Sequence, residues 1–345
     1  MQKIAMRIEI VSSALARFSS MSLESRHAIL TTLAKHYSDV RITLINDASD
    51  LSDLAARQPD LVFLGMSSIV IEDELGFGRL RRVWLSDFLD ELDITYTGSQ
   101  RGAHELEHHK PLAKQRVLDA GLDTSPYLVA ENGRMPILNG SALTYPLFIK
   151  PTDRGGGTGV DSRSVTHNVG QAQAKINSIA AELKSDALIE AYLPGREFSV
   201  AILRETDAPE FLAMPIELVA SEDENGVRIL SSAIKHANSE WVSAVSQATT
   251  ADIVSRLALA CFKTLGGRDY GRIDIRLDKA GRPQFLEANL IPSLIDGYGS
   301  FPKACLINQG LSHEAMLIRI VTLALARLPL PVPAVAGSLA VDTAT

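Results

Sequence analysis

Residues 271–289 constrain the fold of this chain more than any other stretch. Apolar and polar side chains alternate along residues 271–278, and a second alternating run at 285–289 follows the turn Lys279-Ala280-Gly281. This pattern predicts a β-hairpin, because successive side chains of a strand point to opposite faces. One face of the first strand should carry Ile273, Ile275 and Leu277, and the other Arg272, Asp274 and Arg276. The second strand should carry Phe285, Glu287 and Asn289 on a common face.

Folding about this turn would bring two carboxylates together. Asp274 then lies close to Glu287, while Asn289 adds an amide oxygen and Arg272 stands beside them. Oxygen ligands of this kind suit Mg²⁺, which takes a few protein oxygens and shares its remaining positions with phosphates. The pattern therefore predicts a metal site formed by Asp274, Glu287 and Asn289. The alternative is a solvated polar face on the hairpin.

The size and charge of the chain bear on its class. The 345 residues are 46% hydrophobic and 22% charged, an ordinary globular composition with room for two or three domains. A net charge of −7 gives no indication of nucleic-acid binding. Cys261 and Cys305 lack metal or redox spacing and stand in apolar segments, so we expect buried free thiols. The N-terminus lacks a signal-peptide pattern and no apolar run reaches the roughly 18 residues that span a bilayer, so we expect a cytoplasmic protein without a membrane partner.

The chain divides into three expected units and a tail. In residues 1–99, predicted strands at 4–11, 41–45, 61–65 and 94–96 alternate with helical segments at 29–37 and 84–92. This βαβ rhythm predicts a parallel sheet, and the lack of G-x-G-x-x-G argues against a dinucleotide site. Residues 100–193 contain predicted strands at 147–150 and 187–190, and residues 194–328 carry the hairpin. Residues 329–345 are rich in Pro, Ala and Val, which predicts a disordered tail, with a short docking segment as the alternative.

Two further stretches suggest a nucleotide site. Lys150 ends a predicted strand and is followed by the glycine-rich loop 155–159, whose backbone N–H groups could approach a phosphate closely. This loop is not a Walker A motif, and an ordinary loop is the alternative. Glu190 ends the strand 187–190, and Glu197 follows seven residues later. A buried strand rarely ends in a carboxylate without a partner, which an adenine amine or ribose hydroxyls would supply; the alternative is a solvent-exposed strand end.

Taken together in this order, these motifs resemble those of the ATP-grasp ligases, and more narrowly of the D-alanine–D-alanine ligase family. Residues 94–99 (Ile-Thr-Tyr-Thr-Gly-Ser), 109–114 (His-Lys-Pro-Leu-Ala-Lys), 188–198 and 271–274 are similar to that family's motifs. The resemblance covers residues 94–328 well and residues 1–93 loosely. It implies an α/β (α+β) chain with an N-terminal Rossmann-like parallel-sheet domain followed by two ATP-grasp subdomains.

The resemblance also implies roles for individual residues. Those that would bind ATP are Lys110 and Lys150 on the phosphates, Gly155, Gly156, Gly157 and Thr158 in a flexible lid, Glu190, Tyr192 and Leu193 around adenine, and Glu197 on ribose. Two Mg²⁺ ions, or Mn²⁺ in their place, would be held by Asp274, Glu287 and Asn289. Arg272 would stabilise the acyl phosphate and the tetrahedral intermediate, and Lys235 falls where the family has a lysine on a mobile loop.

The departures from the family pattern lie mostly on the amino-acid side. Glycines stand at 156 and 157 where the family's lid has serines, and His236 replaces a tyrosine and could take a proton from the nucleophile. Ser293 and the nearby Ser300 or Tyr298 are candidates to grip a substrate carboxylate. Glu24 resembles the family's acid that anchors the first amino group. The family's His-Gly and Glu-Asp-Gly stretch is replaced by residues 65–74, which suggests a different substrate.

The implied reaction is a two-step ligation. A carboxylate attacks the γ-phosphate of ATP to give an acyl phosphate and ADP, and an amine then attacks the acyl carbon and releases phosphate. The substrates would be small amino acids or carboxylic acids, and the family expectation is a homodimer. One alternative is an ester-forming or ring-closing ligase of specialised metabolism, motivated by His236. A second is a nucleotide-binding protein without ligase activity.

Overall fold

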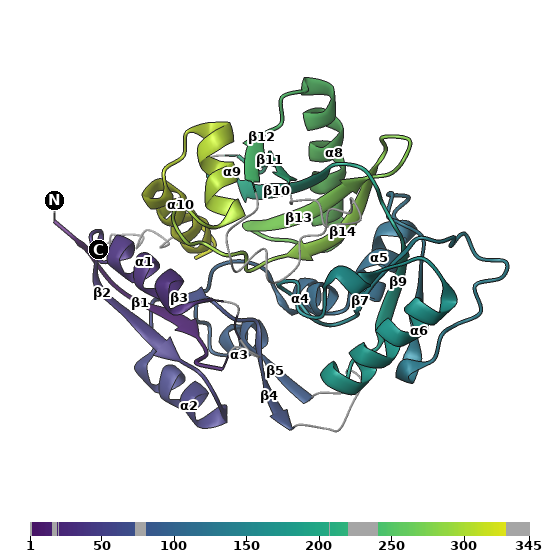
Figure 1. Cartoon of the computed structure of the whole chain (residues 1–345). Coiled ribbons are helices and arrows are strands. Elements are labelled where there is room, and N and C mark those ends of the chain that lie inside the picture. Colours follow the sequence, from purple (N-terminus) through teal and green to yellow (C-terminus); the bar gives the residue numbers. More distant parts are fainter. Residues whose placement is uncertain are drawn as a thin grey trace, which may run out of the picture.

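A computed structural model of the chain describes residues 2–15, 19, 21–72, 81–206, 208–219 and 241–328 (Figure 1). In this part of the chain the strands form three larger sheets and one two-stranded sheet. The larger sheets follow one another along the sequence. Helices lie between the first and second of them, and only residues 192–196 separate the last strand of the second from the first strand of the third.

The N-terminal sheet is parallel, as the βαβ pattern predicts. Its strand order is β2-β1-β3, and both strand pairs are parallel. The elements are β1 (Ile4–Ser12), α1 (Leu23–Leu33), β2 (Tyr37–Leu44), α2 (Ala48–Arg57) and β3 (Leu61–Leu64). The hairpin β4 (Ser68–Glu72) and β5 (Arg81–Trp84) follows, then α3 (Leu85–Glu91). The strand predicted at 94–96 is reduced to a single bridge between Val62 and Tyr96.

The helix predicted at residues 29–37 is displaced in the structure. It is α1, and it begins at Leu23 because the Ser22 side chain accepts a hydrogen bond from the backbone N–H of Ser25 and caps the helix. Its last residue is Leu33, and Tyr37 is already the first residue of β2. The side chain of Tyr37 is buried in the core, so the sequence shows an apolar residue there that fits the apolar pattern of the preceding helix.

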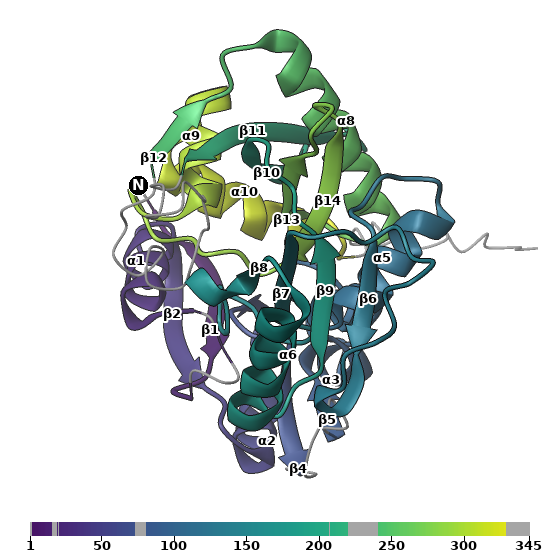
Figure 2. The same ribbon diagram turned by 45° about the vertical axis from the view of Figure 1, so that its right-hand side comes forward.

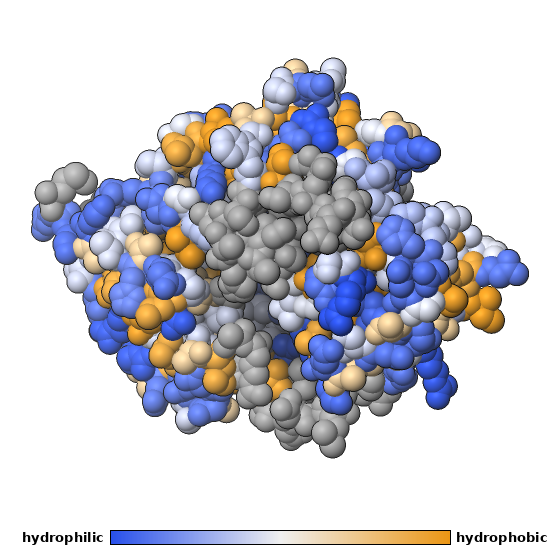
Figure 3. Space-filling model, viewed as in Figure 1, coloured by the Kyte–Doolittle hydropathy of each residue, from blue (hydrophilic) through white to orange (hydrophobic). Residues whose placement is uncertain are grey.

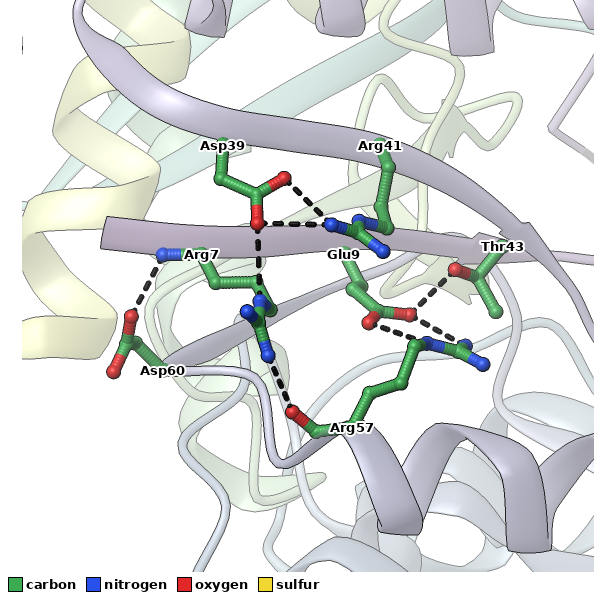
Figure 4. Close-up of polar contacts among 7 residues, drawn as sticks. All are labelled: Arg7, Glu9, Asp39, Arg41, Thr43, Arg57 and Asp60. Atoms are coloured by element: carbon green, nitrogen blue, oxygen red, sulfur yellow. Dashed lines mark hydrogen bonds and ion pairs between the residues drawn. The ribbon is translucent and has the colours of Figure 1, made fainter. Parts of the chain in front are cut away.

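A polar network ties α2 to the N-terminal sheet (Figure 4). Glu9 lies in the central strand β1, and its side chain is fully buried. Arg57 at the end of α2 donates from Nε and Nη2 to the two carboxylate oxygens of Glu9, each at 2.8 Å, and Thr43 Oγ1 donates at 2.5 Å. Burial alone would raise the pKa of Glu9, but these donors outweigh burial and lower it. The partners all belong to the N-terminal sheet and α2, so the network positions the helix.

The central sheet is antiparallel with strand order β6-β9-β7-β8. Its strands are β6 (Tyr127–Ala130), β7 (Leu147–Pro151), β8 (Val165–Thr166) and β9 (Ala187–Ala191), and β7 and β9 confirm the strands predicted at 147–150 and 187–190. Two helices precede the sheet, α4 (Arg101–His108) and α5 (Lys110–Asp119). The helix α6 (Val169–Ser178) covers one face through Ala172 and Ile176.

The C-terminal sheet is also antiparallel, with strand order β12-β11-β10-β13-β14. Its strands are β10 (Glu197–Arg204), β11 (Phe211–Val219), β12 (Trp241–Ala244), β13 (Tyr270–Leu277) and β14 (Pro283–Asn289). Side chains of β10 alternate between two cores: Phe198, Val200 and Ile202 pack with α8 (Ala248–Thr264), and Ala201 and Leu203 belong to the core that includes α9 (Ser300–Gln309).

The predicted hairpin is confirmed as β13 and β14, but one residue points the other way. Asp274 pairs with Glu287, and the next pair is Ile275 with Phe285. Leu286 is therefore an extra residue in β14, a β-bulge that reverses the alternation before it. Phe285 is fully buried among the apolar residues facing α8, so the prediction that it shares a face with Glu287 and Asn289 was wrong.

The chain returns to its own beginning through α10 (His313–Leu325). This helix packs against α1 and β3, and Leu317, Ile320 and Val321 share one core with Ile8 and Ile10 of the N-terminal sheet. Cys261 and Cys305 are buried free thiols, as predicted. Among the described helices, none is both long and apolar enough to cross a membrane.

Candidate active site

A cleft opens between the central and the C-terminal sheets. Figure 2 shows β7 and β9 running toward β13 and β14. The cleft has about 800 Å³ of space between its walls, a volume that includes open solvent at its mouth. The predicted nucleotide and metal residues that line it are Lys110, Lys150, Gly157, Thr158, Glu190, Tyr192, Leu193, Glu197, Asp274 and Glu287.

A buried cluster of charges lies at the base of the cleft. Lys114 Nζ lies 2.7 Å from Glu190 Oε1, and Lys150 Nζ lies 3.0 Å from Glu190 Oε2. Burial alone would raise the pKa of Glu190, but the two ammonium groups outweigh it and lower the pKa to about 2. The sequence suggested that a ligand would be the partner of Glu190; in the structure, two lysines from α5 and β7 already pair with it.

Lys110 stands at the start of α5, where Pro111 follows it in the first turn. Its Nζ donates a hydrogen bond to the carbonyl of Arg154, and it lies 3.8 Å from the Glu287 carboxylate. Burial lowers the pKa of Lys110. The side chain therefore bridges the glycine-rich loop and the hairpin, the two elements expected to meet at the phosphates.

Arg276 also lines the cleft. Arg276 Nη1 lies 3.2 Å from a Glu197 carboxylate oxygen, and Arg276 Nε donates to the Gly195 carbonyl at 3.1 Å. Its guanidinium also stands 5.6 Å from the centre of the Tyr192 ring. Arg276 thus positions both Tyr192 and Glu197, the predicted adenine and ribose residues.

The hairpin holds Asp274 and Glu287 on one face. Arg272 donates to both oxygens of Asp274, each at 2.9 Å, and Ser199 Oγ donates to Asp274 at 2.9 Å. Asn289 Nδ2 donates to an Asp274 oxygen at 3.3 Å, so Asn289 is adjacent to Asp274, although it does not itself line the cleft. No group of three or more His, Cys, Asp or Glu side chains suited to a metal occurs among the described residues. The donor set is instead two carboxylates and an amide, which fits a hard cation that takes further oxygens from phosphates.

The predicted catalytic residues are only partly brought together. Arg272 Nη1 donates to Ser300 Oγ at 3.0 Å, which places Ser300 beside the hairpin. Ser293 is half-buried after β14 and does not line the cleft. Glu24 is exposed in the first turn of α1, where hydrogen bonds from its own backbone N–H and Ser22 lower its pKa, and it does not line the cleft either. Lys235 and His236 lie outside the described residues.

The glycine-rich loop is only partly in the cleft. Gly157 and Thr158 line it, whereas Gly155 and Gly156 do not. Gly156 and Gly157 have φ of +64° and +79°, conformations that glycine adopts at little cost.

Sequence reasoning assigned no role to Lys114, Ser125 or Arg276. Lys114 follows Lys110 by four residues, so both side chains lie on one face of α5, and this spacing could have identified it. Arg276 alternates with Arg272 and Asp274 on the polar face of β13 and could have been identified in the same way. Ser125 carries no comparable signal in the sequence.

The cleft between two antiparallel sheets, following an N-terminal parallel sheet, defines the ATP-grasp class of fold. Solved structures confirm this: the D-alanine–D-alanine ligase from Bacillus anthracis, complexed with ATP, superposes with a TM-score of 0.72 at 19% identity, covering 94% of this chain and 98% of that one. The family model described as D-ala D-ala ligase C-terminus matches residues 117–322, more than half of the chain. The chain therefore belongs to the D-alanine–D-alanine ligase family.

Curated relatives agree with this assignment. A D-alanine–D-alanine ligase of Chromohalobacter salexigens is 26% identical over 314 residues, 91% of this chain and 93% of the relative. One from Alcanivorax borkumensis is 31% identical over 213 residues, 60% of this chain and 62% of the relative. The uncharacterized protein y4sG of Sinorhizobium fredii is 27% identical over 221 residues, 63% of each chain. The protein is accordingly an ATP-dependent ligase of the type that forms C–N bonds.

Proposed function

We propose that this protein uses ATP to join the carboxylate of one small molecule to the amine of another. The observation that carries the proposal is the convergence of Lys110 and Lys150 with Asp274 and Glu287 on one cleft. Ammonium groups of this kind neutralise phosphates, and Glu190, Tyr192, Leu193 and Glu197 provide a wall for adenine and ribose.

The proposed reaction has two steps. The substrate carboxylate attacks the γ-phosphorus of ATP, the bond to the ADP oxygen breaks, and an acyl phosphate forms. The amine nitrogen then attacks the acyl carbon, the bond to the phosphate oxygen breaks, and the amine loses a proton. We place Arg272, oriented by Asp274 and Ser300, where negative charge grows in both steps. We also assign the loop 155–159 to the exclusion of water, which would otherwise hydrolyse the acyl phosphate.

We propose that Mg²⁺ binds at Asp274, Glu287 and Asn289, with Mn²⁺ as a substitute. Asp274 and Glu287 lie opposite each other and line the cleft, and the Asn289 amide contacts Asp274. Two carboxylates suit a cation that also binds phosphate. When bound, the metal neutralises negative charge on the phosphates.

D-alanine is the first candidate substrate, because the named relatives are D-alanine–D-alanine ligases. We propose that Ser300 contributes to the substrate site, since it contacts Arg272. The substrate and catalytic roles of four further residues are proposals that rest on the family resemblance; these residues are Glu24, Ser293, Lys235 and His236. The ester-forming alternative depended on His236, which lies outside the described residues, and no finding supports it.

We further propose units at residues 1–99, 100–193 and 194–328, since each contains one of the three larger sheets. A cytoplasmic location is proposed on the sequence pattern and a homodimer on the resemblance. Sedimentation of the purified protein tests the dimer.

The function is tested by ADP release with Mg²⁺-ATP against D- and L-amino acids, hydroxy acids and amines, singly and in pairs. We expect ADP release to require a carboxylate and an amine together, with a condensation product in the mass spectrum. Stimulation by D-alanine alone would identify D-alanine as both substrates. ADP release that no acid or amine changes would contradict the proposal.

A further inference from the structure

Lys114 is a buried charged group beside the cleft. Its side chain is fully buried, and its Nζ contacts Glu190 Oε1 at 2.7 Å, Thr124 Oγ1 at 2.6 Å and Ser125 Oγ at 3.2 Å. An ammonium group has three N–H donors, so these contacts use all of them. Lys114 is absent from the residues that line the cleft. It therefore has no donor left for a ligand.

Lys150 differs from Lys114 in its position relative to the cleft and in its contacts. It lines the cleft, and among the described residues Glu190 is its ion-pair partner, at 3.0 Å. Moving its ammonium group toward a phosphate would take one cation away from Glu190. Leaving a buried carboxylate without a counter-charge is strongly unfavourable, so the movement needs a second cation that stays behind.

We propose that Lys114 is a positioning residue that keeps Glu190 ionised and oriented while Lys150 turns to the nucleotide phosphates. Ser125 completes the arrangement, because its hydroxyl contacts both Lys114 and Glu190, the latter at 3.2 Å. The nucleotide thus competes for one of two cations, and the other holds the carboxylate in place for adenine. This inference rests on the proposed function of the cleft and assigns a role to a residue outside its lining.

The test is a double-mutant cycle of Lys114→Met and Glu190→Gln, read as the Kd of β,γ-imido-ATP with Mg²⁺ in the full-length protein. In Lys114→Met, Lys150 is the ion-pair partner that remains to Glu190 among the described residues, so we expect the Kd to rise at least about tenfold. In the Glu190→Gln background the charge of Glu190 no longer competes for Lys150, so Lys114→Met should change the Kd less than about threefold. A purely structural role for Lys114 would give equal effects in both backgrounds, which would overturn the inference.

Arg57→Met is the matched control, because it also removes the cation of a buried carboxylate, Glu9, but in the N-terminal sheet (Figure 4). It should lower the melting temperature and leave the Kd unchanged. If Lys114→Met does not fold, Ser125→Ala should raise the Kd by a few-fold and lose that effect in the Glu190→Gln background; equal effects there would also overturn the inference. A wild-type protein that binds no analogue would instead refute the proposed function, and the inference with it.

Discussion

At the residue scale, Glu287 is the side chain on which the metal proposal depends most. It lies opposite Asp274 and lines the cleft. Glu287→Gln keeps its shape but removes its charge, so turnover should fall on the order of 100-fold or more, while the melting temperature stays near that of the wild type. The control is Glu91→Gln, a change at an exposed position of α3, which should leave turnover unaltered. Steady-state ADP release measures both, and near-normal turnover of Glu287→Gln would refute the metal site.

His108 provides a prediction for the pH dependence of stability. Its Nε2 lies 2.7 Å from Ser67 Oγ, and burial lowers its pKa from 6.5 to about 4. Between these pH values the unfolded chain binds a proton at His108 that the folded chain does not, so stability is present above pH 6.5 and is lost as the pH falls toward 4. The loss in the free energy of unfolding is at most about 3 kcal/mol, and partial exposure of the side chain to solvent makes it smaller.

The variant that tests this is His108→Gln, which has no titratable group. Its melting temperature should decline less between pH 6.5 and 4 than that of the wild type. The exposed His27, changed to Gln, is the control and should reproduce the wild-type decline. Parallel curves for wild type and His108→Gln would show that folding does not lower the pKa of His108.

Individual site residues differ in how well the sequence predicts them. The approach of Asp274 to Glu287 follows from strand alternation and one turn, both local properties. The pairing of Lys114 with Glu190 joins a helix to a strand in another part of the fold, and no local pattern encodes that contact. The sequence identified the need for a partner at Glu190 but not its source.

At the scale of elements, the hairpin shows what alternation alone cannot predict. The single extra residue Leu286 turns Phe285 into the core, and its only trace in the sequence is a break in the apolar pattern. β7, β9 and β13 were predicted because their core-facing side chains are apolar and buried. The boundaries of α1 were predicted poorly because its cap, Ser22, was not recognised as one.

The glycine-rich loop yields a prediction with an internal control. Gly157 has a φ of +79° and lines the cleft, so a side chain there costs roughly 1 kcal/mol or displaces the loop. Gly157→Ser should therefore raise the KM for ATP several-fold. Gly155 has no positive φ, and a Cβ there would meet nothing within 4 Å, so Gly155→Ser should behave like the wild type. Equal KM values for the two variants would show that the conformation at Gly157 does not matter for ATP.

At the scale of the whole molecule, the last helix joins the two ends of the chain. Ile320 in α10 is fully buried in the core that also contains Ile8 and Ile10 of β1. Ile320→Ala should lower the free energy of unfolding by about 2–5 kcal/mol. Ile307→Ala in α9, where the side chain is 42% exposed, should cost much less. Urea unfolding followed by circular dichroism measures both, and equal losses would contradict the packing of α10.

The order of the three larger sheets was predictable from the sequence, since each sheet is built from neighbouring segments. The packing of α10 against α1 and β3 could not be predicted from the sequence, because the apolar positions of α10 would fit any buried face equally well.

The central claim is that ATP activates a carboxylate as an acyl phosphate. With the substrate pair that releases ADP, the carboxylate is labelled with ¹⁸O at both oxygens and the phosphate is analysed by mass spectrometry. The two-step reaction predicts one ¹⁸O in each phosphate released and one retained in the amide. Unlabelled phosphate would contradict it, because the bond to phosphorus would then not have formed from the carboxylate.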